Sequence, residues 1–134
     1  MLQNKIVAHF QDGHLLKGST TDFFPNKDVF HISPAEAPPG TKPVEVLVSD
    51  LKALFFVKDF AGFPGREHVQ EFDPSQQVVG RKIRVRFKDG EELLGTTQGY
   101  QPGRPGFFVI PTDPESNNER CYVVASAAEE VSFV

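Results

Sequence analysis

Basic side chains alternate along one segment in the second half of the chain, at Lys82, Arg84, Arg86 and Lys88. Residues two apart in an extended strand project from the same face, so these cations are expected to form a row. Such a row can contact nucleic-acid phosphates or an acidic protein surface. It is also typical of a solvated strand face whose charges prevent edge-to-edge association, and three acidic residues follow between positions 89 and 92. Both interpretations stay open.

Aromatic and polar side chains near this row form a second set of candidate ligand-binding residues. Phe108 is expected to point outward from its strand, where its ring can stack on a nucleic-acid base or pack against the linker or the other half of the chain. The polar loop that follows contains Asn117, Asn118 and Arg120. Loops held on a rigid scaffold are common binding sites, but the same residue types also close turns through side-chain-to-backbone hydrogen bonds.

The spacing of a catalytic or metal site is not found in the sequence. The four histidines and the single cysteine, Cys121, show no metal-ligand spacing, and Cys121 is expected to be a small buried residue. No Gly-rich phosphate loop, nucleophile elbow or pair of catalytic carboxylates is recognisable. We therefore expect a protein that is not an enzyme, with no catalytic residue, no metal and no cofactor.

The segment that carries the basic row belongs to an internal repeat. Residues 5–57 align with residues 82–134 without a gap, and 15 of the 53 pairs are identical. Chance identity at ordinary residue frequencies gives about three. Turn formers and alternating apolar positions account for most of the matches. The pattern indicates that the chain is a duplication, and we call the shift that places residue 5 on residue 82 the repeat offset.

Each copy has the pattern of a small all-β unit. Apolar and polar residues alternate over 5–11 and 82–88, as in a half-buried strand. Both segments are followed directly by Asp-Gly, which favours a tight hairpin turn. The returning strands carry Gly18 and Gly95, which are typical of a bend or a close backbone approach. Three further strands are expected in each copy, at 29–32, 44–48 and 53–57 and at 106–110, 121–125 and 131–134. The predicted fold is all-β, a tandem duplication of a five-stranded SH3-like barrel packed into one compact unit.

The expected organisation is a first barrel at residues 1–57, an irregular linker at 58–81 and a second barrel at 82–134. Three Phe residues in the linker indicate that it lies against the barrels, with one helical turn near 66–71. Phe55 and Phe56 make the last strand of the first copy apolar on both faces. The extra face at Phe55 therefore needs a cover, either from the second half or from a protein partner.

The run at residues 83–90, followed by Leu93 and Gly95, resembles the opening of an Sm-like domain, and residues 10–18 repeat it. The resemblance implies a strand, a turn at a polar pair and a second strand bent at a glycine. Sm-like proteins use an Asp and an Asn after this glycine in their RNA pocket. Here Asp22 and Asn26 stand closer to the glycine than that pattern requires, so the RNA-binding residues do not carry over.

The chain as a whole also resembles an uncharacterised bacterial family of duplicated small barrels, on the runs at 85–90, 106–108 and 113–120. That resemblance implies no particular activity. Composition limits the possibilities further: 18 acidic and 14 basic side chains give a formal net charge of −4, which disfavours indiscriminate binding to phosphate backbones. No apolar run approaches the roughly 20 residues of a membrane helix, and no signal peptide is recognisable. We expect a soluble cytoplasmic protein without membrane contact.

Two functional hypotheses follow. The preferred one is a non-enzymatic adaptor that binds another protein, or a second copy of itself, through exposed strand edges and the apolar face near Phe55. The alternative is an Sm-like RNA-binding protein that uses the basic row of the second copy. The candidate protein-contact residue is Phe55, and the candidate ligand-binding residues are Lys82, Arg84, Arg86, Lys88, Phe108, Asn117, Asn118 and Arg120.

Overall fold

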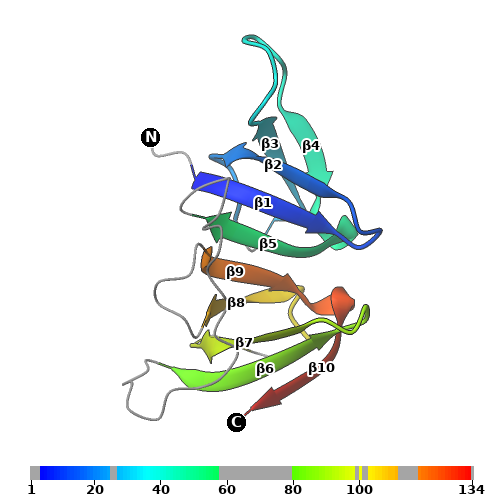
Figure 1. Cartoon of the computed structure of the whole chain (residues 1–134), viewed down its shortest axis with the longest axis vertical. Helices are drawn as coiled ribbons and strands as arrows, with labels where there is room; N and C mark the ends of the chain where they lie inside the picture. The colour runs from blue at the N-terminus through cyan, green and yellow to red at the C-terminus, as the bar shows by residue number, and fades with distance from the viewer. Residues whose placement is uncertain are drawn as a thin grey trace, which may run out of the picture.

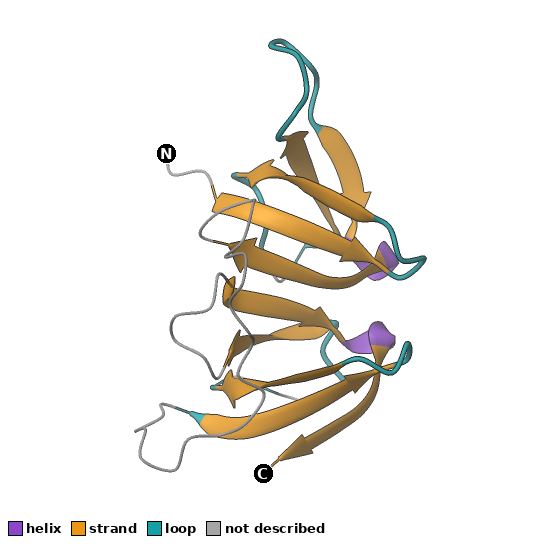
Figure 2. Cartoon of the chain, in the orientation of Figure 1, coloured by secondary structure: helices purple, strands orange, loops and turns teal. Residues whose placement is uncertain are grey.

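The computed structural model of the chain describes residues 4–24, 27–57, 80–98, 100, 103–111 and 118–133. In these ranges the regular elements are β-strands and two three-residue 3-10 helices, η1 and η2 (Figure 1; Figure 2). In chain order they are β1 (Asn4–Phe10), β2 (Leu15–Thr20), β3 (Val29–Pro34), β4 (Val44–Leu47), η1 (Val48–Asp50), β5 (Leu51–Val57), β6 (Arg81–Phe87), β7 (Glu92–Thr97), β8 (Gly106–Pro111), β9 (Asn118–Val124), η2 (Ala125–Ala127) and β10 (Ala128–Phe133). The predicted all-β fold class is confirmed.

The strands form one 10-stranded antiparallel sheet in the order β10-β6-β7-β8-β9-β5-β1-β2-β3-β4 (Figure 1). This sheet is open, with β10 and β4 at its two edges. The sequence predicts two five-stranded barrels with exposed strand edges, whereas the structure joins all the described strands in one sheet, in which β5 pairs with β9 of the other half and not with β4. Because β5 already pairs with β1 on its other side, both of its hydrogen-bonding edges are occupied and it cannot also pair with β4.

The elements of the two halves recur at the repeat offset, the same shift that aligns the two segments of sequence. The first residues of β1 and β6 are Asn4 and Arg81, those of β2 and β7 are Leu15 and Glu92, and those of β3 and β8 are Val29 and Gly106. The 3-10 helices begin at Val48 and Ala125, with the same spacing. We call β1–β5 the first half and β6–β10 the second half.

Glycines shape both halves at matching positions. The hairpins β1–β2 and β6–β7 turn at Gly13 and Gly90, whose φ angles of 97° and 91° lie in the region that favours glycine. Within β2 and β7, a Cβ atom on Gly18 or Gly95 would collide with a backbone oxygen of the neighbouring strand. The close backbone approach that the sequence predicts at these two glycines is confirmed.

The central pair of strands, β5 and β9, separates two hydrophobic cores while contributing to both (Figure 1). Leu54 and Phe56 on one face of β5 belong to the core of the first half, together with Tyr122 of β9. Phe55 on the opposite face belongs to the core of the second half, together with Val123 of β9. Every residue of β5 is buried. Each half therefore completes the core of the other.

Several element boundaries differ from the prediction. β5 begins at Leu51 and β9 at Asn118, both earlier than the apolar pattern indicates. Leu51 is added to β5 because it pairs with Phe10 of β1, and the first residues of β9 are added because Asn118 and Arg120 pair with Val57 and Phe56 of β5. The linker predicted at 58–81 and its helical turn lie outside the described residues, except for the last two positions, and Arg81 already begins β6.

Candidate binding sites

Lys82, Arg84 and Arg86 of the basic row lie on the outer face of β6, as the alternating pattern predicts, and Lys88 lies in the turn directly after this strand. Arg84 and Arg86 approach the carboxylate of Glu92 on β7, with nitrogen-to-oxygen distances of 4.0 and 3.5 Å. On the other side of β6, the ladder places Glu130 of β10 opposite Arg86. The row is therefore part of a surface of mixed charge.

Phe108 and Arg120 lie where the two halves meet. Phe108 is half-buried, and its ring centroid is 5.1 Å from that of Tyr122 and 6.2 Å from that of Phe56. The Arg120 guanidinium covers these rings, 4.3 Å from the Phe56 centroid and 5.1 Å from the Phe108 centroid. The contact of Phe108 with the other half, one of the two roles that the sequence allows for it, is present in the structure. Asn117 lies outside the described residues, as does the side chain of Asn118.

Phe55 is covered by the second half and is only 8% exposed. Its ring centroid lies 4.6 Å from that of His9 on β1. Burial in this contact, reinforced by the charge of Lys52, lowers the pKa of His9. The apolar face at Phe55 therefore offers no exposed surface to a separate protein, because the second half packs on the same side of β5.

A charged cluster that sequence reasoning missed joins the two halves. Lys52 is a buried residue of β5, and its Nζ lies 2.7 Å from a carboxylate oxygen of Asp89 and 3.3 Å from one of Glu91. The Lys52 hydrogen bond, with a second from the Glu91 backbone N–H, lowers the pKa of Asp89. Nothing in the sequence pairs Lys52 with these acids, because their contact depends on the docking of one half on the other.

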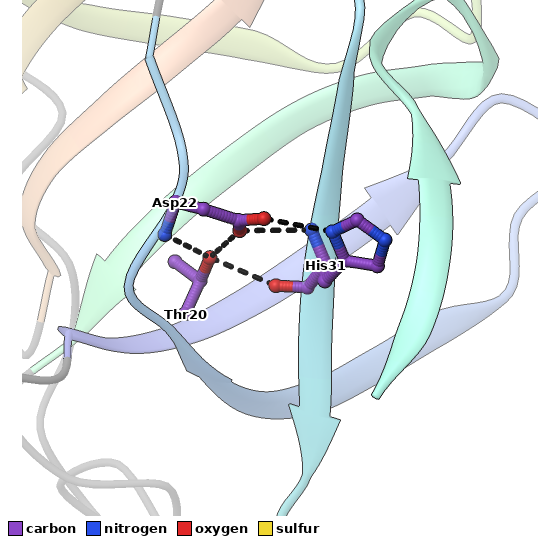
Figure 3. Close-up of polar contacts among 3 residues, drawn as sticks. All are labelled: Thr20, Asp22 and His31. Carbon is purple, nitrogen blue, oxygen red and sulfur yellow. Dashed lines mark hydrogen bonds and ion pairs between the residues drawn. The ribbon is translucent and has the colours of Figure 1, made fainter. Parts of the chain in front are cut away.

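Thr20, Asp22 and His31 form a polar cluster between β2 and β3 (Figure 3). The Thr20 Oγ1 lies 2.9 Å from the His31 carbonyl oxygen and 3.2 Å from an Asp22 carboxylate oxygen. Asp22 accepts hydrogen bonds from the backbone N–H and the ring Nδ1 of His31, at 2.9 and 2.7 Å. Partial burial acts to raise the pKa of Asp22, but the hydrogen bonds from His31 and Thr20 outweigh it and lower this pKa.

The Thr20 cluster links the end of β2 to β3. Thr20 is 3% exposed, so its hydroxyl faces the protein interior and not a substrate. In the second half Thr97 makes the equivalent hydrogen bond, with its Oγ1 2.8 Å from the Phe108 carbonyl oxygen. The matching threonines in the two sequence copies are the signal that identifies this contact. Because the second half keeps this bond without an Asp–His pair, the threonine hydrogen bond is a structural feature of both halves, and the Asp–His pair is present in the first half alone.

A groove of about 600 Å³ is lined by both halves, next to the two 3-10 helices. Five pairs of lining residues correspond at the repeat offset: Lys27 with Arg104, Asp28 with Pro105, Leu47 with Val124, Val48 with Ala125, and Ser49 with Ser126. Gln11 links the two serine residues of the groove, because its Nε2 donates hydrogen bonds to the Ser49 carbonyl oxygen at 3.0 Å and to the Ser126 Oγ at 3.2 Å. The groove exists only because the halves are joined.

The junction groove, as we call this feature, combines charge, hydroxyl groups and apolar surface. Two cationic side chains, Lys27 and Arg104, line it with one acidic residue, Asp28, among the residues that the structure describes. Leu47 in its wall is 45% exposed and gives the groove an apolar surface. Sequence reasoning missed the groove, although the repeated Ser49 and Ser126 lie in it. This combination of side chains is suited to binding.

The part of the chain that the structure describes contains no group of three or more His, Cys, Asp or Glu side chains placed to hold a metal ion. It also contains no helix with the length and hydrophobicity needed to cross a membrane.

Comparisons with known proteins add one finding. A protein-family model described as "Family of unknown function (DUF6982)" matches residues 2–134. Neither the curated proteins nor the solved structures gave a match.

Proposed function

The chain belongs to a family of unknown function, DUF6982, and we propose that it is a non-enzymatic binding module that recognises another protein through the junction groove. The observation that carries this proposal is the groove itself, which has the volume of a binding site and is lined by matching residues of both halves. We also propose that the halves are tandem copies of an SH3-like, Sm-like unit. The repeat offset, which is the same in the sequence and in the strand positions, supports a duplication.

The chemistry of the junction groove favours an acidic peptide segment as its occupant. Lys27 and Arg104 supply two positive charges, and the Ser49 and Ser126 hydroxyls can bond to carboxylate oxygens or to a peptide backbone. Leu47 supplies exposed apolar surface for an alkyl or aromatic side chain of the partner. This locally basic groove lies on a chain whose formal net charge is −4, so the charge difference directs an acidic partner to this site.

RNA binding through the basic row is the competing function. The exposed guanidinium groups of Arg84 and Arg86 support it. The carboxylate of Glu92, which lies within 4.0 Å of both, reduces the attraction for phosphates. The two functions use different residues, so variants can separate them.

The test is affinity capture with matched baits, after nuclease treatment of the extract. The groove variant carries Lys27→Glu and Arg104→Glu; the control carries Lys42→Glu and Lys88→Glu, which change the total charge equally at exposed positions elsewhere. We expect the native and control baits to retain the same protein, and the groove variant to lose nearly all of it. A partner retained equally by all three baits contradicts the proposal.

Filter binding to single-stranded RNA over a salt series addresses the competing function. Salt-sensitive binding that is lost on Arg84→Glu with Arg86→Glu, and unchanged in the groove variant, would assign the function to the basic row instead. Under our proposal the native chain shows no such binding at physiological salt.

A further inference from the structure

The two edge strands of the sheet correspond to the two strands that meet at its centre. At the repeat offset, β10 is the counterpart of β5, and β4 is the counterpart of the last four residues of β9. In the sheet order, β4 pairs only with β3 and β10 pairs only with β6 among the described strands. The contact between β5 and β9 joins different surfaces of the two halves, head to tail, so the same contact can in principle recur between β10 of one copy and β4 of the next.

The internal pairing fixes the register that such a contact would have. In the β5–β9 ladder, Ala53 lies opposite Val123 and Phe55 lies opposite Cys121. The counterparts of these pairs place Glu130 opposite Val46, and Ser132 opposite Val44, of a second copy. We call β10 with the adjacent outer face of β6 the donor edge, and β4 the acceptor edge.

The surface of β1 and β5 that corresponds to the donor edge, and that makes the internal contact, is apolar. Val7 of β1 and Ala53 and Phe55 of β5 are all buried against the second half, and all three belong to its core. Val7 and Phe55 lie opposite each other in the β1–β5 ladder, so they form one continuous patch. Burial of this patch stabilises the junction through the hydrophobic effect.

The donor edge has polar residues at the same positions. The counterparts of Val7, Ala53 and Phe55 are Arg84, Glu130 and Ser132. The Arg84 side chain is 52% exposed, and Glu130 is also exposed. Docking this edge on a second copy would bury a guanidinium and a carboxylate in an apolar core, which is unfavourable without close pairing partners. This contrast also gives the basic row a structural purpose, because Arg84 belongs to it.

The acceptor edge is altered as well. The counterpart of Arg120 is Pro43, which has no backbone N–H to donate to a ladder, and the counterpart of Tyr122 is Glu45. β4 has four residues, whereas β9 has seven. The edge still retains apolar surface, since Val44 is 42% exposed while its counterpart Cys121 is fully buried. Proline and charged residues are common means of keeping a strand edge unpaired.

We propose that the donor and acceptor edges are complementary parts of a self-association surface whose partner is a second copy of this chain, blocked in the native protein by Arg84, Glu130 and Ser132 on one edge and by Pro43 and Glu45 on the other. The occupant is a second copy because the chain contains the same contact between its own halves. The blocking residues stop the head-to-tail array at two units.

The experiment gives each edge the residues that the internal β5–β9 contact has at the corresponding positions, one edge at a time. The donor variant carries Arg84→Val, Glu130→Ala and Ser132→Phe; the acceptor variant carries Pro43→Arg and Glu45→Tyr. We expect light scattering to give the 14.9 kDa monomer mass for the native chain and for each variant alone. Mixing the two variants should give a 1:1 complex of twice that mass, and a chain that carries all five substitutions should form longer assemblies.

Other results contradict the proposal. A native chain that self-associates at micromolar concentration shows that the edges are not blocked. Two folded variants that remain monomeric when mixed show that the edges are not complementary, and a variant that assembles alone shows that the opposite edge needs no unblocking. Far-UV circular dichroism and thermal unfolding confirm folding. If Ser132→Phe causes the donor variant to misfold, a second donor variant that carries only Arg84→Val and Glu130→Ala is used in its place. We expect it to form the same mixed complex.

Discussion

At the scale of single residues, Lys52 is the side chain that couples the halves electrostatically. It comes from β5 of the first half and reaches the β6–β7 hairpin of the second, where its ammonium group donates a hydrogen bond to Asp89 and forms an ion pair with Glu91. Its side chain is 10% exposed, whereas those of its partners are 55% and 56% exposed. The partners can therefore be rehydrated if Lys52 is removed, which limits the energetic cost.

We expect Lys52→Met to lower the free energy of unfolding by about 1 kcal/mol, the upper end for an ion pair whose acids face water. Urea unfolding at neutral pH measures this change. Lys42→Met, at an exposed loop position, is the control and should change stability by less than about 0.5 kcal/mol. Equal effects of the two substitutions would show that the cluster does not stabilise the junction.

The pH dependence of this pair has a defined sign. Its hydrogen bonds lower the pKa of Asp89 below the ordinary value of 3.8, so the native state favours the ionised carboxylate. The contribution to stability is therefore complete above pH 3.8 and is lost as the pH falls through the lowered pKa. The stability difference between native and Lys52→Met proteins should shrink on acidification below that pH. A difference that grows on acidification would contradict this assignment.

At the scale of elements, the mid-strand glycines allow each second strand to cross closely against the next. The backbone oxygens of Ser33 and Ile110 occupy the space that a Cβ atom on Gly18 or Gly95 would need. These are backbone atoms of a paired strand, so relief requires movement of the ladder and not of a side-chain end.

We expect Gly18→Ala and Gly95→Ala each to destabilise the protein by about 2–3 kcal/mol, as in overpacked interiors. The two should have similar effects, because the contacts around them are equivalent. Gly40→Ala is the control: no atom lies within 4 Å of its Cβ position, and only its φ of 84° is unfavourable, so about 1 kcal/mol is expected. Chemical denaturation measures the free energy of unfolding of all three variants. If Gly18→Ala or Gly95→Ala destabilises the protein no more than Gly40→Ala does, the close backbone contact at that glycine is contradicted.

At the scale of the whole molecule, each half depends on residues of the other. Phe55 belongs to β5 of the first half, yet it is part of the core of the second half. Its neighbour Leu54 points to the opposite face and is part of the core of the first half. Substitutions at these two adjacent positions should therefore destabilise different halves of the molecule.

Phe55→Ser gives β5 the residue that β10 has at the corresponding position, and we expect it to cost about 3–5 kcal/mol through the cavity that it leaves. Hydrogen exchange should show the larger loss of amide protection in β6–β8. The matched control is Leu54→Ala, which should mainly affect β2 and β3. If both substitutions loosen the same half to the same degree, the alternating assignment of β5 to two cores is incorrect.

Local residue chemistry in the sequence was enough to determine the strands and their turns. Alternation over residues 82–88, the Asp-Gly turns and the placement of Gly18 and Gly95 act within a few residues or through the backbone alone, so they can be recognised without a fold. The internal repeat likewise predicted that the elements would recur at the repeat offset.

Only the tertiary structure decided which strand pairs with which. The apolar pattern of β5 shows that both of its faces need cover, but the pattern is the same whether the cover is a protein partner or the second half of the chain. The pairing of β5 with β9 joined the halves in one sheet, and the contact between the halves buried Phe55, brought Lys52 to Asp89 and created the junction groove. These contacts join residues distant in the chain, and the hydrophobic effect that drives them has no direction, so sequence periodicity cannot specify the partner.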